Sequence, residues 1–393
     1  MITINRPTIK IEGENAILAN TLCIDGEEKE LWFQTNKKYA DYLCWERGDA
    51  YLIAVLNYAM VHHHDINIVD VPISEDLLFN IETYLIDALI ENNPSYYRPN
   101  IKATSISEKL PNAGAVGTGI SCGVDSLHSL ANHHASEFKS HNITHLAFNN
   151  VGSHGTGQGA RELFNKRVER PKRFAEEYGF EFVISDSNLM EVIPQDHFKT
   201  HTYSSMFPVF CLQKLYSIYF YASGGYRFNE FRLNQDGLIC CGSYEMLSLP
   251  CFSNGNIKIL SEGMGHTRMD KLKKVALYKP SYRYLNVCLL EGDNCNKCEK
   301  CVRTMLGLDA INALDHYSAV FDVAYYRSHK KWYLQQMLYQ MAVGRHDYFE
   351  IYPYFKSEVT LDMRMKVIVR KIYRKIEPVI LPLWIKFKNK NKR

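Results

Sequence analysis

Short β-prone runs alternate with segments of helical periodicity through the middle of the chain. Apolar runs at residues 146–148 and 182–185 lie on either side of a long amphipathic segment, residues 160–178. Strands that alternate with helices form parallel sheets with crossover helices. The pattern therefore predicts an α/β fold with a parallel sheet. It also predicts a largely apolar helix over residues 206–222 and a fourth strand over residues 237–243.

The pattern divides the chain into three regions. Residues 1–110 show alternating strands, then helices over 50–61 and 74–90, which predicts a small N-terminal α/β extension. Residues 111–315 carry the strand–helix alternation and form the expected catalytic domain. Residues 316–393 are expected to be a helical C-terminal region, with helices over 332–343 and 363–376.

Composition narrows the class of protein. The chain has 393 residues, 46% of them hydrophobic, which suits a globular protein of several domains. It contains no apolar run long enough to span a membrane and no secretory signal pattern. Its eleven cysteines then indicate a reducing compartment, so a cytoplasmic location is expected. The three adjacent histidines, residues 62–64, point to different faces of a helix and are not expected to share a metal.

A polar glycine turn between a predicted strand and a predicted helix is the first candidate site. It reads Ser121, Cys122, Gly123, Val124, Asp125, Ser126. Backbone N–H groups at such a turn favour an anion, and the two serines add hydroxyl donors. Asp125 would repel a phosphate unless Mg²⁺ lay between them. The turn therefore predicts a phosphate site with a bridging metal ion, and it lacks the lysine of a Walker A loop.

Four cysteines near residue 300 form the second candidate site. Two interlocked C-x-x-C steps and one upstream cysteine have the spacing of a tetrahedral zinc set: Cys288, Cys295, Cys298 and Cys301. An iron–sulfur cluster is the alternative metal centre, and a disulfide framework does not suit a chain without an export signal. Basic neighbours such as Arg303 can offset the thiolate charge.

The two motifs together resemble one known family. The 121–126 turn is similar to the S-G-G-x-D-S loop of the PP-loop ATP pyrophosphatases, whose fold is adenine nucleotide alpha hydrolase-like. The order of loop, cysteine knuckle and following arginine resembles the 7-cyano-7-deazaguanine synthases of queuosine biosynthesis. That resemblance covers about half of the chain. It implies a ligase that adenylates a carboxylate or amide oxygen with ATP and Mg²⁺, releases pyrophosphate and AMP, and captures ammonia.

The resemblance also assigns site residues. ATP would lie over the 121–126 loop, with Phe148 and Asn149 beside the adenine. Asp125 would hold Mg²⁺, and Arg268 would stand where PP-loop synthetases place a lysine near the pyrophosphate. A guanidinium there could bind the leaving group by two hydrogen bonds. Glu262 is a further candidate base or Mg²⁺ ligand. The zinc knuckle would be structural.

Two departures from the family leave alternatives open. Cys122 stands where the family has a glycine, so it is either a small residue that the turn tolerates or a reactive thiol at a helix start. The substrate segment Tyr-Pro-Asp-Cys-Arg is absent. The alternatives are therefore an amidotransferase that acts on a surface-polysaccharide sugar, a tRNA-thiolation enzyme using Cys122 or Cys251, and a non-enzymatic zinc protein.

The C-terminal tail differs in charge from the rest. Residues 361–393 hold eleven Lys/Arg against Asp362 and Glu377. Basic and apolar residues at helical spacing, followed by Trp384, suit an anionic membrane surface, RNA or an inert tail. A peripheral membrane location is therefore an alternative to a purely cytoplasmic one. A small-molecule substrate, ammonia and a second copy of the chain complete the expected partners.

Overall fold

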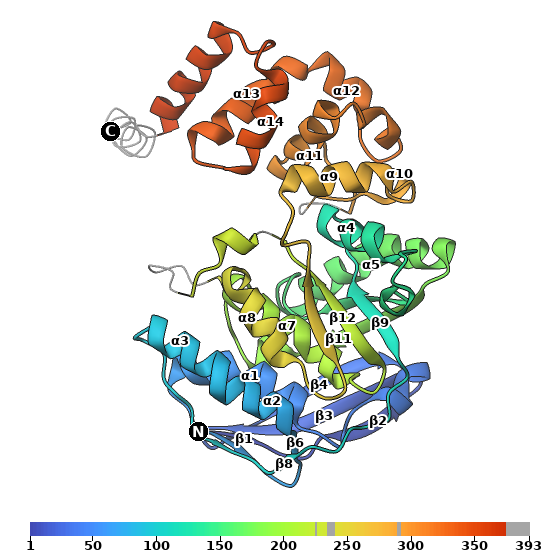
Figure 1. Ribbon diagram of the computed structural model, residues 1–393, viewed down its shortest axis with the longest axis vertical. Coiled ribbons are helices and arrows are strands. Elements are labelled where there is room, and N and C mark those ends of the chain that lie inside the picture. The colour runs from blue at the N-terminus through green and yellow to red at the C-terminus, as the bar shows by residue number, and fades with distance from the viewer. Residues whose placement is uncertain (225, 234–239, 289–291, 375–393) are drawn as a thin grey trace, which may run out of the picture. The chain divides into compact units, whose positions relative to one another are not determined.

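The computed structural model describes residues 1–224, 226–233, 240–288 and 292–374. Their ribbon is drawn in colour in Figure 1. The chain forms two compact units, Met1–His266 and Thr267–Arg393. We describe each unit by itself. The sequence suggested three regions with boundaries near 110 and 315, whereas the units divide after His266.

Five parallel strands form the centre of the first unit. Their order across the sheet is β13-β12-β9-β10-β11. They comprise β9 (Ala115–Gly119), β10 (His145–Asn150), β11 (Glu181–Ser187), β12 (Tyr216–Ala222) and β13 (Lys258–Glu262). The connecting helices include α4 (Val124–His133), α5 (Gly157–Tyr178), α6 (Leu189–Val192), α7 (His197–Cys211) and α8 (Glu245–Phe252). The predicted α/β class with parallel strands is confirmed.

The fourth parallel strand is not where the sequence pattern placed it. The helix predicted over 206–222 is wrong in its second half, because α7 ends at Cys211 and residues 216–222 form β12. A largely apolar run fits a buried helix and a buried strand equally well, and here the polar pair Gln213 and Lys214 lies in the turn between the two elements. Of the strand predicted over 237–243, residues 237–239 lie outside the described residues. Cys241–Tyr244 form the short 3-10 helix η5.

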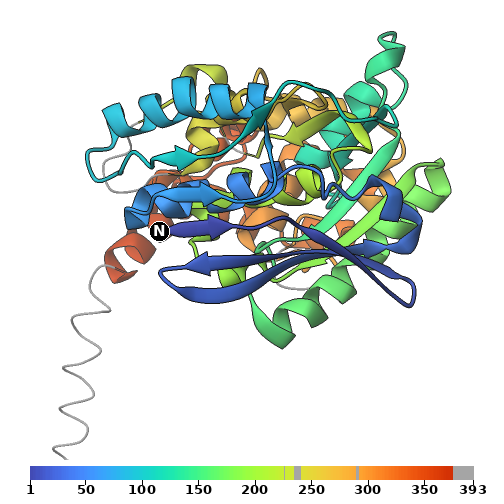
Figure 2. The ribbon, with the colours of Figure 1, turned by 90° about the horizontal axis from the view of Figure 1, so that it is seen from below.

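The N-terminal strands continue the same sheet. Strand β4 pairs antiparallel with β11, and the order runs on through β3, β1, β5 and β7. These strands are β1 (Ile2–Ile4), β3 (Asn15–Ile24), β4 (Glu27–Asn36), β5 (Ile66–Ile68) and β7 (Ile101–Lys102), with β2 (Thr8–Glu12) paired to β3. Figure 2 shows the N-terminal strands (dark blue) as a twisted ribbon. Residues 1–110 therefore extend the central sheet.

One hydrophobic core supports this extended sheet. It joins residues from Ile2 to Ile259 in a single buried cluster. Helix α1 (Asp49–His62) is apolar on nearly every side, and most of its side chains are buried. It packs mainly against α7. The segments that follow α1 include β6 (Ile73–Ser74), which pairs with β8 (Ser105–Ile106), and the helices α2 (Glu75–Asn80) and α3 (Ile86–Asn92). Ser74 is the N-cap residue of α2.

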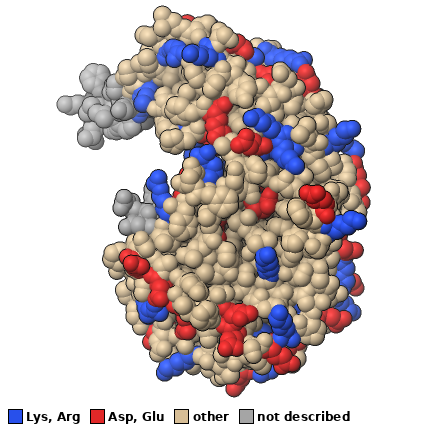
Figure 3. Space-filling view, viewed as in Figure 1, with Lys and Arg blue, Asp and Glu red and all other residues tan. Residues whose placement is uncertain are grey.

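Helices make up the second unit. They are α9 (Arg268–Leu277), α10 (Ser281–Tyr284), α11 (Glu299–Ala310), α12 (Val323–Ser328), α13 (Lys330–Ala342), α14 (Asp347–Phe355) and a last helix over 361–374. Thr267 caps α9 in a capping box with Asp270. Among the described residues no helix is both long and apolar enough to cross a bilayer. On the face in Figure 3, acidic and basic side chains are interspersed.

Candidate functional site

The order of the parallel strands reverses beside β9. The chain runs from β9 outward through β10 to β11, then crosses back through α7 to β12 on the other side of β9. In open α/β sheets, ligands bind beyond the carboxyl ends of the strands, where the order reverses in this way. The 121–126 loop follows the carboxyl end of β9 directly. The tertiary structure thus places the loop that the sequence singled out at the binding position of the fold.

Hydrogen bonds with its own two serines, Ser121 and Ser126, stabilise the 121–126 loop. The N–H of Gly123 donates to Ser121 Oγ at 3.2 Å, and Ser126 Oγ donates to the Gly123 carbonyl at 3.2 Å. Ser121 N–H points to Ser126 Oγ at 3.4 Å. Gly123 is the N-cap residue of α4 and supplies no side-chain acceptor to the first turn, which contains Asp125. The arrangement brings two hydroxyls, a helix start and a carboxylate to one strand end.

Cys122 faces the protein interior. Its backbone φ is 56°, the left-handed conformation that favours glycine, and its side chain is fully buried. Burial raises the pKa of the Cys122 thiol to about 12, so the thiolate form is disfavoured near neutral pH. Burial likewise raises the pKa of Cys251 to about 11. The left-handed backbone and the burial of Cys122 favour its interpretation as a small residue in the turn.

Asn149 is tied to its neighbours at the end of β10. Its side-chain oxygen accepts a 2.7 Å hydrogen bond from Ser185 Oγ on β11. The Tyr219 side chain of β12 is hydrogen-bonded to Asn149 from the other side. Burial raises the pKa of Tyr219, and this hydrogen bond partly offsets the rise. Strand β9 lies between Tyr219 and Asn149. Its Gly117 leaves room for the Tyr219 ring, because a Cβ at that position would come within 2.8 Å of the ring. Phe148 stacks on Phe164 with ring centroids 5.1 Å apart.

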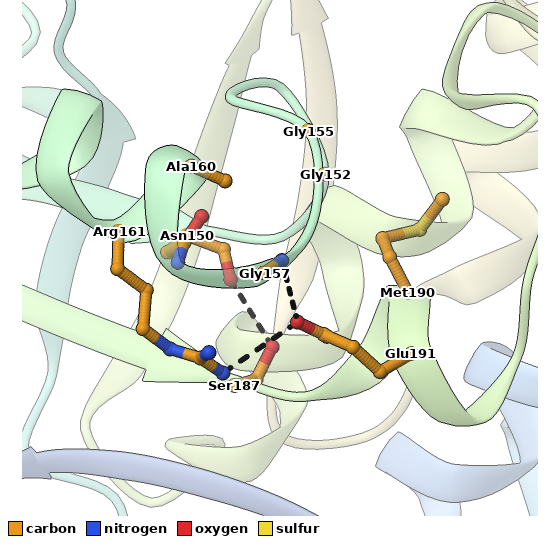
Figure 4. A pocket seen from close by; sticks show the side chains of 9 residues that line it. All are labelled: Asn150, Gly152, Gly155, Gly157, Ala160, Arg161, Ser187, Met190 and Glu191. Atoms are coloured by element: carbon orange, nitrogen blue, oxygen red, sulfur yellow. Dashed lines mark hydrogen bonds and ion pairs between the residues drawn. The ribbon is translucent and has the colours of Figure 1, made fainter.

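A small pocket opens beside β10 and β11 (Figure 4). Arg161 lies in it between two carboxylates, 3.4 Å from Asp186 and 3.5 Å from Glu191. Glu191 also accepts a 3.3 Å hydrogen bond from the N–H of Gly157, the first residue of α5. An acidic side chain therefore engages the start of α5, and Arg161 links it to the end of β11.

A histidine, a tyrosine and a cysteine meet at the carboxyl end of β12. His201 Nδ1 is hydrogen-bonded to the Tyr221 hydroxyl at 2.6 Å, and His201 Nε2 lies 3.8 Å from Cys240 Sγ. Burial lowers the pKa of His201 to about 4, so its imidazole is neutral near pH 7. Sequence reasoning missed this group because it assigned Tyr221 to a helix and treated Cys240 only as a core residue.

Glu262 connects the end of β13 to α4. Its carboxylate accepts a 2.8 Å hydrogen bond from Asn132 and lies 3.1 Å from His133 Nε2. Burial alone would raise the pKa of Glu262, but hydrogen bonds from His133 and Asn132 hold it below its usual value. Both oxygens are engaged, so the geometry favours a role in positioning α4 over that of a free base.

The four predicted metal-ligating cysteines lie together in the second unit. The sulfur atoms of Cys288, Cys295, Cys298 and Cys301 all lie within 4.8 Å of one another. Asn296 has a φ of 60° in the turn between the second and third cysteines, and Cys298 is the N-cap residue of α11. The predicted four-cysteine set is confirmed as a cluster that can hold a metal ion. Arg303 pairs instead with Asp347.

Arg268, the remaining predicted site residue, is the first residue of α9 in the second unit. Comparisons with protein-family models, with curated proteins and with solved structures gave no match. The fold and the site thus define an α/β protein with a polar loop at the switch point of its sheet and a four-cysteine cluster.

Proposed function

We propose that the protein is an ATP-dependent ligase of the PP-loop type. It adenylates a carboxylate or amide oxygen, releases pyrophosphate, and joins an ammonia or amine nitrogen to the activated carbon. The observation that carries the proposal is the position of the 121–126 loop, which lies beyond β9 at the point where the strand order reverses. The resemblance of the loop to the PP-loop motif supplies the type of chemistry.

In this proposal the loop holds the triphosphate. The N–H groups at the start of α4 and the hydroxyls of Ser121 and Ser126 face charge that develops on the phosphates. Asp125 in the first turn would hold Mg²⁺, which neutralises phosphate charge when bound. Phe148 and Asn149 at the end of β10 would border the adenine.

The acceptor would bind over β12, on the other side of β9 from β10. Here the His201 imidazole, which is neutral and hydrogen-bonded to Tyr221, would contribute a polar contact to the acceptor. A carboxylated deazapurine is the substrate that the resemblance suggests. A carboxylated surface-polysaccharide sugar is the second candidate. Burial and the raised pKa values of Cys122 and Cys251 do not favour the tRNA-thiolation alternative.

The four-cysteine cluster would hold zinc as a closed structural site. Four thiolates leave no open position for a substrate, and tetrahedral zinc binds sulfur at about 2.3 Å. Cys301 lies in the first turn of α11 and Cys298 at its N-cap, so the ion would fix the start of that helix. The proposed cofactors are therefore ATP, Mg²⁺ and Zn²⁺.

Product analysis tests the proposal. Purified, zinc-loaded protein would be incubated with ATP, Mg²⁺ and ammonium, with 7-carboxy-7-deazaguanine in one sample and no acceptor in another. AMP and pyrophosphate formed only with the deazapurine would support both the chemistry and the substrate. ATP binding without turnover would direct the search to carboxylated sugars. A protein that fails to bind ATP would overturn the proposed function.

A further inference from the structure

The last described helix, residues 361–374, presents an apolar stripe to solvent. It is the red helix before the grey trace in Figure 1. Four aliphatic side chains at spacings of four, three and four residues share one helical face. They are exposed by half or more of their surface: Leu361 75%, Met365 52%, Ile368 50% and Ile372 51%. We refer to these four residues as the aliphatic stripe.

The opposite face of the helix holds it to the unit. Met363 and Val367 are buried, and at 100° per residue both lie across the helix from the aliphatic stripe. Arg370 donates a 2.8 Å hydrogen bond to Gln336 Oε1 and lies over the ring of Tyr339, 4.1 Å from its centroid. Lys371 Nζ donates to the carbonyl of Ala342 at 2.6 Å. These contacts fix which face of the helix points outward.

Cationic side chains lie on either side of the stripe. Arg364 and Lys371 project on one side and Lys366 on the other, beyond Val369, whereas Arg370 lies on the packed face. The helix carries five Lys/Arg and one acidic residue, Asp362. Asp362 pairs with Lys366 at 3.2 Å and with Lys331 at 3.1 Å. An apolar centre with positive margins is the pattern of a helix that lies in the interface of an anionic membrane.

We infer that the helix over residues 361–374 docks the protein on the surface of an anionic lipid membrane through the aliphatic stripe. Aliphatic side chains gain free energy when they enter the boundary of the acyl chains, and the flanking cations meet lipid phosphates and carboxylates. Single-stranded RNA would favour several aromatic side chains, on which bases stack, whereas the stripe is aliphatic and Tyr373 is the one exposed aromatic side chain of this helix. The inference does not depend on the proposed ligase activity.

Vesicle sedimentation of the full-length, zinc-loaded protein tests the inference. One set of vesicles contains phosphatidylcholine alone, and the other contains phosphatidylserine as well. We expect binding to the anionic vesicles only, and weaker binding at high salt. Replacing both Ile368→Gln and Ile372→Gln should lower vesicle affinity about tenfold or more, because two large apolar contacts with the membrane are lost.

The matched control is Leu277→Gln, since Leu277 is 81% exposed on α9 outside the stripe. It should bind vesicles as the wild type does. Equal binding by the stripe variant, or equal binding to both kinds of vesicle, would overturn the inference. So would sedimentation-velocity data in which the stripe variant turns a dimer into a monomer, since the stripe would then bind a second copy. Binding to a single-stranded oligoribonucleotide without binding to vesicles would also overturn it.

Discussion

The side-chain amide of Asn254 donates a 2.9 Å hydrogen bond to the carboxylate of Asp49, although 205 residues separate them. Asp49 is fully buried at the start of α1. Its carboxylate also accepts from Ser74 N–H at 2.9 Å and from Ser74 Oγ at 2.6 Å. The group joins the N-terminal region to the segment before β13. It explains, together with the common sheet, why residues 1–266 form one unit.

Replacement of Asp49 should therefore destabilise the whole first unit. Asp49→Ala removes the acceptor of two buried donors of Ser74 and of the partly buried Asn254 amide, which we expect to cost about 3 kcal/mol of unfolding free energy. Urea unfolding would measure the change, with the exposed Asp41→Ala as control. An unfolding free energy equal to that of the wild type would show that the hydrogen-bonded group contributes nothing to stability.

Removal of the Asp125 charge should abolish turnover. In the proposed mechanism Asp125→Asn loses the Mg²⁺ ligand, and we expect product formation to fall by about three orders of magnitude. Nucleotide binding should weaken less, because the N–H groups and serines of the loop remain. Initial rates and ATP titrations would separate the two effects, with the exposed Glu162→Gln on α5 as control. Full activity in Asp125→Asn would contradict the metal-binding role.

Glycine should be tolerated at position 122. The φ of 56° is strained for cysteine and relaxed for glycine, so Cys122→Gly should retain activity within about threefold and change the stability by about 1 kcal/mol or less. Cys122→Val, with a β-branched side chain at this φ, should cost about 2 kcal/mol. Rates and melting temperatures of both variants would be compared. Complete loss of activity in Cys122→Gly alone would revive the thiol-based alternative.

Loss of one cluster cysteine should release the metal. We expect purified wild-type protein to hold about one equivalent of zinc and Cys298→Ser to hold much less. The second unit should also become sensitive to protease, since metal binding contributes to folding. Elemental analysis gives the stoichiometry, and Cys23→Ser, outside the cluster, is the control. Iron in place of zinc would identify the alternative cluster, and unchanged metal content in Cys298→Ser would disprove the assignment of the four cysteines as metal ligands.

Stability should decline in mild acid. Burial lowers the pKa of both His201 and His154 to about 4, from an unperturbed 6.5. Below pH 6.5 these two histidines bind protons in the unfolded chain but not in the folded protein. The stability present above pH 6.5 is therefore lost progressively toward pH 4. Urea midpoints at several pH values would show the decline. The decline should be smaller in His201→Gln, whereas the exposed-site variant His346→Gln should show the same decline as the wild type.

Short-range features of the fold could be predicted from the sequence. The C-x-x-C spacing brings Cys295 and Cys298 together through a single turn, and Thr267 caps α9 through a residue three positions away. The 121–126 turn likewise follows its strand and opens its helix as expected. In each case the partners are near neighbours in the chain, so residue type and spacing suffice.

Long-range features were decided only by tertiary structure. Residues 216–222 became a strand because β9 and β13 offer hydrogen-bonding partners on both sides, which a largely apolar run cannot reveal. His201 and Cys240 are 39 residues apart and meet because the crossover through α7 returns the chain to the edge of β9. The sequence by itself determined the chemical groups and their local turns. The tertiary structure decided which of them meet, because packing of the sheet and its core brings together residues that the sequence separates.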